Sequence, residues 1–93
     1  MFAIGFDLVV AEAARSHPKG AAQAYYDLGK TLNGFGFKRI QGSVFLTESD
    51  DMANLFAALL PLRELPWFPT TVRDIRAFRV EQWSDFTSLM KQP

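Results

Sequence analysis

The sequence contains no cysteine and a single histidine, His17. Without cysteine there is no disulfide framework, no thiol nucleophile and no zinc site with cysteine ligands. One histidine per chain also excludes a cluster of histidine ligands and the paired histidines of some nucleases. Because His17 precedes a proline at a predicted helix start, we expect it to be a surface or capping residue.

Long hydrophobic runs are absent as well. A membrane-spanning helix needs about 20 consecutive, mostly apolar residues, and no run in this sequence approaches that length. The N-terminus also lacks the charged lead and the small-residue cleavage site of a signal peptide. We therefore expect a cytoplasmic protein that has no membrane partner.

A net charge is also missing, because ten basic and ten acidic residues balance to zero. Binding to nucleic acid or anionic lipid would therefore depend on a local group of charges. The basic residues are unevenly spread: Arg73, Arg76 and Arg79 lie close together, and Lys38-Arg39 is a second pair. Arginines on an amphipathic strand could equally form a solvated face.

The chain has 93 residues, which predicts a single domain covering residues 1–93. A domain of this size buries only about 60% of its unfolded surface when it folds alone. Hydrophobic residues make up 48% of the sequence and aromatic residues 14%. We therefore expect further burial by self-association, as a homodimer.

Two segments carry the apolar spacing of an amphipathic helix. The first runs from about residue 17 to 34, where apolar residues recur at alternating steps of four and three. Its apolar stripe consists of Ala21, Tyr25, Leu28, Leu32 and Phe35. Ser16 or His17 is the predicted cap, and Asn33-Gly34 offers the left-handed residue that ends the helix.

The second helix follows residues 49–51, Ser-Asp-Asp, which supply a cap and acidic residues in the first turn. Its apolar positions are Met52, Leu55, Phe56, Leu59 and Leu62. Pro61 lacks a backbone donor, so we expect this helix to end or kink near Leu60. Residues 66–69 are expected to form a loop.

Four segments have the composition of β-strands. They are residues 1–10, 37–40, 44–47 and 71–80. The two short strands are separated by Gln41-Gly42-Ser43, a tight turn because glycine tolerates a positive φ angle. Ser84 to Thr87 is expected to cap a final helical turn.

The predicted order is therefore strand, helix, strand, strand, helix, strand. This is an α+β arrangement, the ferredoxin-like or split βαβ fold (βαββαβ). Right-handed crossovers then give the spatial strand order fourth, first, third, second, with every neighbouring pair antiparallel. Both helices are expected to cover the same face of the sheet.

Asp7 is an ionisable residue within the apolar first strand. Alternation places Phe2, Ile4, Phe6 and Leu8 on one face of that strand and Ala3, Gly5, Asp7 and Val9 on the other. An unpaired buried carboxylate is too costly to retain. The Asp7 side must therefore be open or hold a partner, and the phenylalanine side is the face that the helices cover.

Three distant segments should meet at one edge of this sheet, because antiparallel neighbours bring the end of one strand beside the start of the next. They are Asp7, the turn Gln41-Gly42-Ser43, and the segment Arg73-Asp74-Ile75-Arg76. Aspartates bind divalent cations through oxygen, and arginine binds phosphate oxygens bidentately. The group suits metal-assisted or arginine-assisted handling of a phosphodiester. Equally, ion pairs between these acids and arginines could simply fix strand register.

At these residues the sequence resembles the virulence-associated protein D (VapD) family of small bacterial proteins. The resemblance covers almost the full length. It rests on Phe6-Asp7-Leu8, Gln41-Gly42-Ser43-Val44, Trp67-Phe68, Val72 to Glu81, and Ser84-Asp85-Phe86-Thr87. The long block from Val72 to Glu81 is the most specific of these motifs.

The resemblance implies a ferredoxin-like homodimer that acts as an endoribonuclease. Members are toxin-like or stress-linked RNA interferases, related in fold to the small nuclease-like subunit of CRISPR adaptation complexes. Some occur beside a small antitoxin, which is therefore a candidate partner. The residues associated with activity in the family carry over here as Asp7, Ser43 and Asp74.

We hypothesise cleavage of single-stranded RNA or mRNA at this site. Asp7 would act as a ligand of a divalent cation such as Mg²⁺ or as the general base. Arg73 or Arg76 would steady the phosphate, with Gln41 in the substrate-binding group. Ser43 would orient the phosphate or a water molecule.

Functions from two other classes stay open. A non-catalytic RNA- or protein-binding dimer would keep the fold and the arginines, and would bind RNA without shortening it. A structural or toxin-neutralising partner in a two-protein complex would co-purify with an extra small chain. Incubation of the purified protein with labelled RNA distinguishes cleavage from binding.

Overall fold

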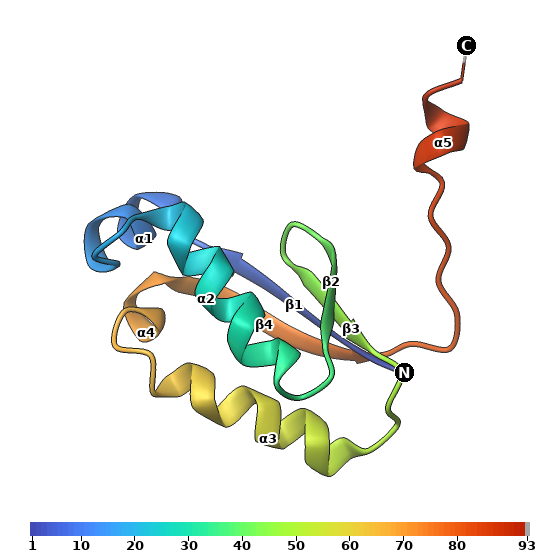
Figure 1. The fold of residues 1–93 in the computed structure, drawn as a ribbon, viewed down its shortest axis with the longest axis horizontal. Helices are drawn as coiled ribbons and strands as arrows, with labels where there is room; N and C mark the ends of the chain where they lie inside the picture. Colours follow the sequence, from blue (N-terminus) through green and yellow to red (C-terminus); the bar gives the residue numbers. More distant parts are fainter. Residues whose placement is uncertain (93) are drawn as a thin grey trace.

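The computed structural model describes residues 1–92, which form an α+β fold around a four-stranded sheet (Figure 1). The strands are β1 (Phe2–Leu8), β2 (Lys38–Gln41), β3 (Val44–Thr47) and β4 (Val72–Arg79). They lie in the order β2-β3-β1-β4, and each neighbouring pair is antiparallel. The ferredoxin-like strand order predicted from the connection rules is confirmed.

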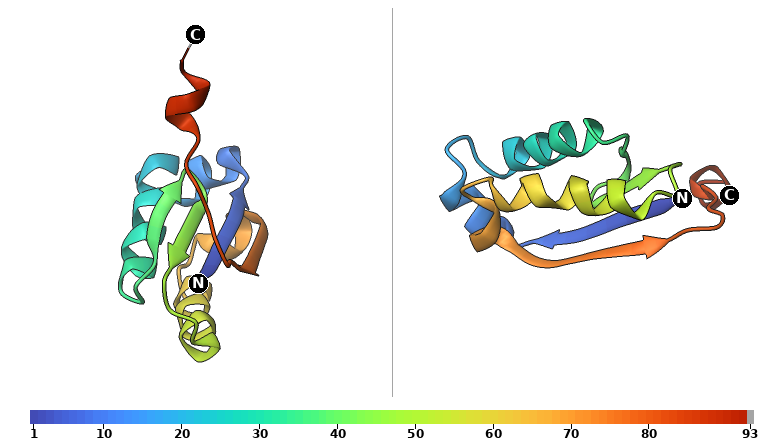
Figure 2. Two further views of the ribbon diagram at one scale, coloured as in Figure 1. Left: turned by 90° about the vertical axis from the view of Figure 1, so that its right-hand side faces the viewer. Right: turned by 90° about the horizontal axis from the view of Figure 1, so that it is seen from below.

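Helices cover one face of this sheet. They are α1 (Val10–Ser16), α2 (Ala21–Asn33), α3 (Met52–Arg63) and α4 (Phe68–Thr71). A fifth helix, α5 (Thr87–Met90), lies away from the sheet in the C-terminal arm (Figure 1). Figure 2 shows the two long helices, α2 and α3, side by side on the same face, as predicted. No helix of residues 1–92 is long and apolar enough to cross a membrane.

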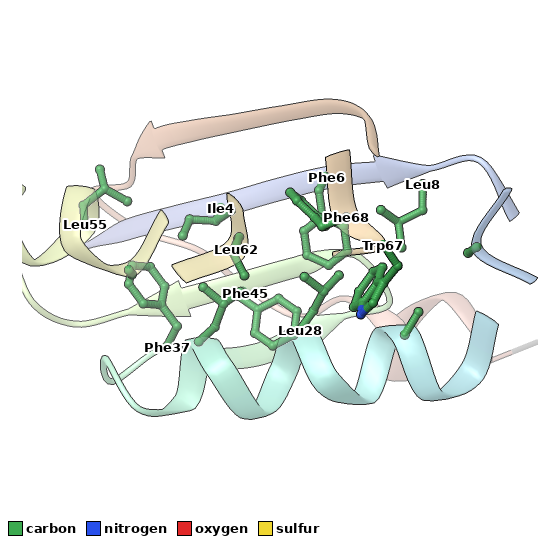
Figure 3. Close-up of a cluster of buried hydrophobic side chains, with 14 of the residues drawn as sticks. Ile4, Phe6, Leu8, Leu28, Phe37, Phe45, Leu55, Leu62, Trp67 and Phe68 are labelled. Carbon is green, nitrogen blue, oxygen red and sulfur yellow. The ribbon is translucent and has the colours of Figure 1, made fainter. Parts of the chain in front are cut away.

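The core lies between this covered face and the helices (Figure 3). From β1 it takes Phe2, Ile4, Phe6 and Leu8, which are at most 6% exposed. Leu28 of α2 and Leu62 of α3 pack against them. Full burial of each such side chain contributes about 1.5–3 kcal/mol. This burial fixes the register of β1 and therefore directs Asp7 to the opposite, open face.

Helix α1 was not predicted from the sequence. It is rich in alanine, the strongest helix former, but seven residues are too few to show a periodic apolar stripe. Ser16 closes α1 and therefore does not cap α2, whose N-cap is Gly20 with φ 88°. The predicted left-handed end at Gly34 is also wrong: its φ is −61°, and Gly36 takes the positive φ of 83°.

We expected Pro61 to end or kink α3 near Leu60. The end at Leu60 is wrong, because the helix continues to Arg63. The proline lies in the last turn, where it removes a single backbone donor. Leu62 is buried in the core, and Glu64 N donates to Pro61 O at 3.1 Å to close the end. At the other end Asp51 is the cap, since its side chain accepts from Ala53 N at 2.9 Å. The prediction of acidic residues in the first turn is therefore wrong, because the first turn of α3 contains none.

Two connections also differ from expectation. The β2–β3 hairpin is present, but Gly42 has no positive φ, so its turn does not depend on that property of glycine. The predicted loop at residues 66–69 includes the start of α4 at Phe68. Both Trp67 and Phe68 are buried there, at 6% and 5% exposed.

Candidate active site

Asp7 and Asp74 lie directly opposite each other in the β1–β4 ladder. Directly opposite residues point to the same face of a sheet, with Cβ atoms about 4.5–5.5 Å apart. Both side chains are open to solvent, at 55% and 48% exposed. Like charges in such positions destabilise a sheet, so this pair of carboxylates needs nearby positive charge.

Two arginines of β4 supply that charge. Arg73 Nη1 donates to Asp7 Oδ2 at 3.3 Å, and Arg76 Nε donates to both oxygens of Asp74 at 3.2 and 3.1 Å. The two arginine side chains are 63% and 70% exposed. Exposed pairs of this kind contribute about 0.2–1 kcal/mol each. The ion pairs that could fix strand register are therefore present. They are weak, so a ligand can replace either partner.

Arg73 reaches this face because the strand is irregular. In the ladder Asp7 pairs with Asp74 and the next residue, Leu8, pairs with Val72, so Arg73 is an extra residue in β4. In a regular strand its side chain would point away from the face that carries Asp74. A β-bulge re-aims a side chain in this way. The bulge places the guanidinium of Arg73 beside the carboxylate of Asp7.

The β2–β3 turn lies next to the same part of β1. Phe6 N donates to Ser43 O at 3.0 Å, which ties the turn to the residue before Asp7. Gln41 pairs with Val44 on the outer strand β2, so it lies two strands away from β1. The structure therefore brings Asp7, Asp74, Arg73 and Arg76 together on the open face, places the backbone of Ser43 beside Phe6, and leaves Gln41 at a distance.

The same end of the molecule holds a second polar group that was missed from the sequence. His17, expected at the surface or as a cap, is 6% exposed, and its Nε2 lies 2.6 Å from Asp27 Oδ2. The two residues are ten positions apart across a turn, so no helical spacing indicates the contact. The only available signal was that the single histidine lies beside the apolar start of a helix.

A metal ion would have limited ligands within one chain. In the described part of the chain no three residues of the types His, Cys, Asp and Glu are grouped so that they could hold an ion. Asp7 and Asp74 nevertheless offer two exposed carboxylates on one face. Mg²⁺ commonly binds one or two carboxylates and completes its six positions with water and phosphate oxygens. The two aspartates fit that form of site.

No family model matches the chain. It is 66% identical to a Neisseria gonorrhoeae protein named Endoribonuclease VapD homolog, over 98% of this chain and 99% of that protein. It is 54% identical to Endoribonuclease VapD of Haemophilus influenzae, with the same coverage. A Helicobacter pylori protein of that name is 39% identical, over 98% of this chain and 99% of its own length.

These identities extend over nearly the whole of both chains, and they agree with the resemblance seen in the sequence motifs. The chain belongs to the Endoribonuclease VapD family.

Proposed function

We propose that this protein is an endoribonuclease that cleaves single-stranded RNA or mRNA on the open face of its sheet. The observation that carries the proposal is the position of Asp7 directly opposite Asp74, with an arginine on each, in a chain whose relatives are named endoribonucleases. The acids and arginines are all exposed, so a phosphodiester can reach them. Ser43 lies in the adjoining turn, where its carbonyl oxygen accepts from Phe6 N.

Binding of the phosphate begins with the arginines. A guanidinium matches two phosphate oxygens bidentately, and most of each arginine side chain is free of protein. Because the Arg73–Asp7 pair is weak, a phosphate can take the place of the carboxylate. This exchange frees Asp7 while keeping a positive charge beside the reacting phosphorus, where it stabilises the negative charge that develops.

Asp7 then acts as the general base. Its carboxylate accepts the proton of the attacking hydroxyl, the new P–O bond forms, and the bond to the leaving oxygen breaks. The leaving oxygen takes a proton from water. Ser43 orients the phosphate or the attacking group through its hydroxyl. General base catalysis by a positioned carboxylate typically contributes about 10²–10⁴-fold.

A divalent cation, Mg²⁺, is the proposed alternative at this site: Asp7 and Asp74 would hold it, and Asp7 would then be a metal ligand instead of the general base. When bound, the cation supplies Lewis acid stabilisation of the phosphate. Titration of Mg²⁺ against a chelator tests this part of the proposal. Cleavage that is lost in the chelator and restored by Mg²⁺ supports it, whereas full activity in the chelator leaves the arginines as the only source of charge stabilisation.

We also propose that the protein acts as a homodimer. The C-terminal arm, residues 81–92, leaves the body of the molecule and is exposed along its whole length (Figures 1 and 2). Four large apolar side chains of the arm are 48–74% exposed: Trp83, Phe86, Leu89 and Met90. A group of this kind in water marks an interaction site. Packing of the arm on a second copy would bury it.

The dimer is tested by measuring mass in solution. Sedimentation or light scattering is expected to give twice the chain mass for the whole protein. Removal of residues 81–93 should shift the equilibrium toward monomer. The truncated chain should still fold, because β4 already ends at Arg79 and Val80 N still donates to Met1 O at 2.9 Å. A monomer for the full chain, or an unchanged dimer after truncation, contradicts the proposal.

Cleavage itself is tested with purified protein and end-labelled RNA. Wild type is expected to shorten the RNA, and Asp7→Asn to leave it intact. Glu64→Gln is the matched control, because Glu64 is an exposed acid at the end of α3, on the helical side. Unchanged cleavage by Asp7→Asn would end the assignment of Asp7.

One observation favours a second function, RNA binding without cleavage. Both candidate acids are already engaged by arginines, which is the arrangement of a binding surface as much as of a catalytic one. In that case the wild-type protein would retard labelled RNA in a gel without producing shorter fragments. The same RNA incubation therefore separates the two functions.

Two further proposals rest on family membership rather than on geometry. The first is that the protein works in the cytoplasm, where mRNA is available. The second is that a small antitoxin protein binds it. Purification of the tagged protein from its native host should then yield an additional small chain, and its consistent absence would argue against an antitoxin.

A further inference from the structure

A groove of ≈ 580 Å³ lies on the helical side of the molecule, where α1, α2 and α4 meet. Its lining includes His17, Lys19, Gln23, Asp27, Trp67 and Thr70. Sites for small ligands have volumes of about 300–1,000 Å³ and combine apolar walls with a few fixed polar groups. This groove has both, and the proposed cleavage mechanism uses none of its residues.

His17 contacts three other residues that line the groove: Trp67, Asp27 and Lys19. It is 6% exposed, and its ring meets the ring of Trp67 edge-on at 5.1 Å. Lys19 N donates to His17 Nδ1 at 3.0 Å, so Nδ1 is an acceptor and Nε2 carries the proton. Nε2 therefore donates to Asp27 Oδ2 at 2.6 Å. The tautomer of the imidazole, and with it the position of the carboxylate, is set by the turn before α2.

Asp27 is the polar group that a ligand would meet. Gln23 Nε2 donates to its second oxygen, Oδ1, at 3.0 Å. A carboxylate has about four acceptor positions on its two oxygens, so one remains on each oxygen after these two bonds. The side chain is 31% exposed, which leaves these positions open to the groove. The hydrogen bond from His17 lowers the pKa of Asp27, which keeps the group ionised.

Two acceptors side by side select a ligand edge with two adjacent donors. Among nucleobases only guanine has such an edge, formed by N1–H and the exocyclic N2 amine. Adenine and cytosine place an acceptor beside their amine, and uracil flanks its single N–H with two carbonyls. The apolar lining by Pro18, Pro66 and Trp67 suits a flat ring, and the ammonium of Lys19 at the rim suits a phosphate.

The groove is close to the proposed cleavage site. Thr70 lines it and precedes Arg73 by three residues, so their Cα atoms are at most about 11 Å apart. The segment between them is held to the end of β1, because Val9 N donates to Thr71 O at 2.8 Å. An RNA chain that passes round this end of the sheet would contact both the groove on the helical side and the acids on the open face.

We propose that this groove binds a guanine base of the RNA substrate, with Asp27 reading its N1–H and N2 amine and Lys19 facing a phosphate. The assignment of the base to an RNA rests on the proposed function. Binding of guanine in the groove gives the enzyme a preference for RNA with guanine near the cleaved bond. His17 and Gln23 act as positioning residues, since they hold Asp27 rather than touch the base.

Direct binding is measured by the fluorescence of Trp67 in a Trp83→Phe background, titrated with GMP. We expect a saturable change with GMP and binding at least about fivefold weaker for inosine monophosphate, which lacks only the N2 amine. AMP, CMP and UMP should bind more weakly still. Equal affinities for GMP and inosine monophosphate, or no response to GMP, would overturn the guanine assignment.

Two variants test the named contacts. Asp27→Asn should weaken GMP binding at least about fivefold, because the amide offers a donor where the base also has a donor. Since loss of this network could disturb the turn, Lys19→Ala is the second variant, and Lys19 is exposed. It should weaken binding of GMP but not of guanosine. An equal loss for both ligands, or none for either, contradicts the placement of the phosphate.

The outcome for the groove can be separated from the outcome for the proposed function. Asp7→Asn should bind GMP like wild type while failing to cleave RNA. If wild type cleaves RNA but shows no GMP response, the groove proposal fails and the function stands. If GMP binds but wild type does not cleave RNA, the proposed function fails, and the assignment of the base to an RNA substrate fails with it.

Discussion

Asp7 and Asp27 are both paired aspartates, but they lie in opposite surroundings. The Asp7–Arg73 pair is on the open face of the sheet, with side chains 55% and 63% exposed and atoms 3.3 Å apart. The Asp27–His17 pair is on the helical side, with side chains 31% and 6% exposed and atoms 2.6 Å apart. The first pair is weak and can be exchanged for a ligand. The second is built into the fold.

This contrast distinguishes side chains that serve activity from side chains that serve stability. Removing an exposed ion pair changes stability little, because water already solvates both charges. Removing one partner of a buried hydrogen bond leaves the other unsatisfied, which costs about 1–3 kcal/mol. Substitutions at the open face should therefore affect activity, and substitutions at His17 should affect folding.

The largest expected effect is on catalysis, at the acid opposite Asp7. Asp74→Asn should slow single-turnover RNA cleavage by about 100-fold or more, since this acid belongs to the proposed reacting group. The free energy of unfolding in urea should change by less than about 0.5 kcal/mol, because the side chain is exposed. If the free energy of unfolding fell by as much as the activation free energy of cleavage rose, the open face would not differ from the helical side in its effect on stability.

His17→Ala is the reverse experiment. It removes the ring that packs on Trp67 and the donor to Asp27, so the free energy of unfolding should fall by about 1–3 kcal/mol. For a domain of this size that corresponds to a fall in Tm of about 4–8 °C per kcal/mol. A thermal melt measures it, and an unchanged melt would show that this pair is no more structural than the exposed ones.

Protonation of Asp27 should contribute to the pH dependence of the free energy of unfolding. Its pKa in the folded protein lies below the ordinary value of 3.8, chiefly because of the hydrogen bond from His17. The unfolded chain therefore binds this proton more readily, so the contribution is fully present above about pH 5 and is lost as the pH falls through the lowered pKa. Urea melts between pH 6 and about pH 3 should be flatter for Asp27→Asn than for wild type. Identical slopes would contradict the pairing.

The smallest effect is expected from the exposed pair itself. A double-mutant cycle of Asp7→Ala and Arg73→Ala should give a coupling energy of about 0.2–1 kcal/mol, falling further in high salt. Urea melts of the four proteins provide it. A coupling well above this range would mean that the pair serves strand register rather than exchange with a phosphate.

Much of the fold could be predicted because its causes are local. The alternation from Phe2 to Leu8 indicated the covered face, and the apolar stripe through Leu28 indicated α2. Connection rules then supplied the strand order, which is the step that brought Asp7 and Asp74 together. The assignment of residues 1–93 to a single domain stays a prediction.

The features that were missed depend on contacts between distant residues. Asp7 and Arg73 are 66 positions apart in the sequence, and the bulge that turns Arg73 toward Asp7 arises from the register between their two strands. No local sequence pattern indicates it. The burial of His17 depends on packing against Trp67 across the fold. Gln41 was placed in the substrate group because it adjoins Ser43 in sequence, but the sheet puts it on the outer strand.

In the proposed mechanism, Asp7 acts on RNA bound to the open face. The most direct test is the single-turnover cleavage rate of Asp7→Asn, measured beside its Kd for the same RNA. We expect the rate to fall by about 100-fold or more while RNA binding is retained, because a negative charge is removed and the arginines remain. A cleavage rate equal to that of wild type would contradict the account.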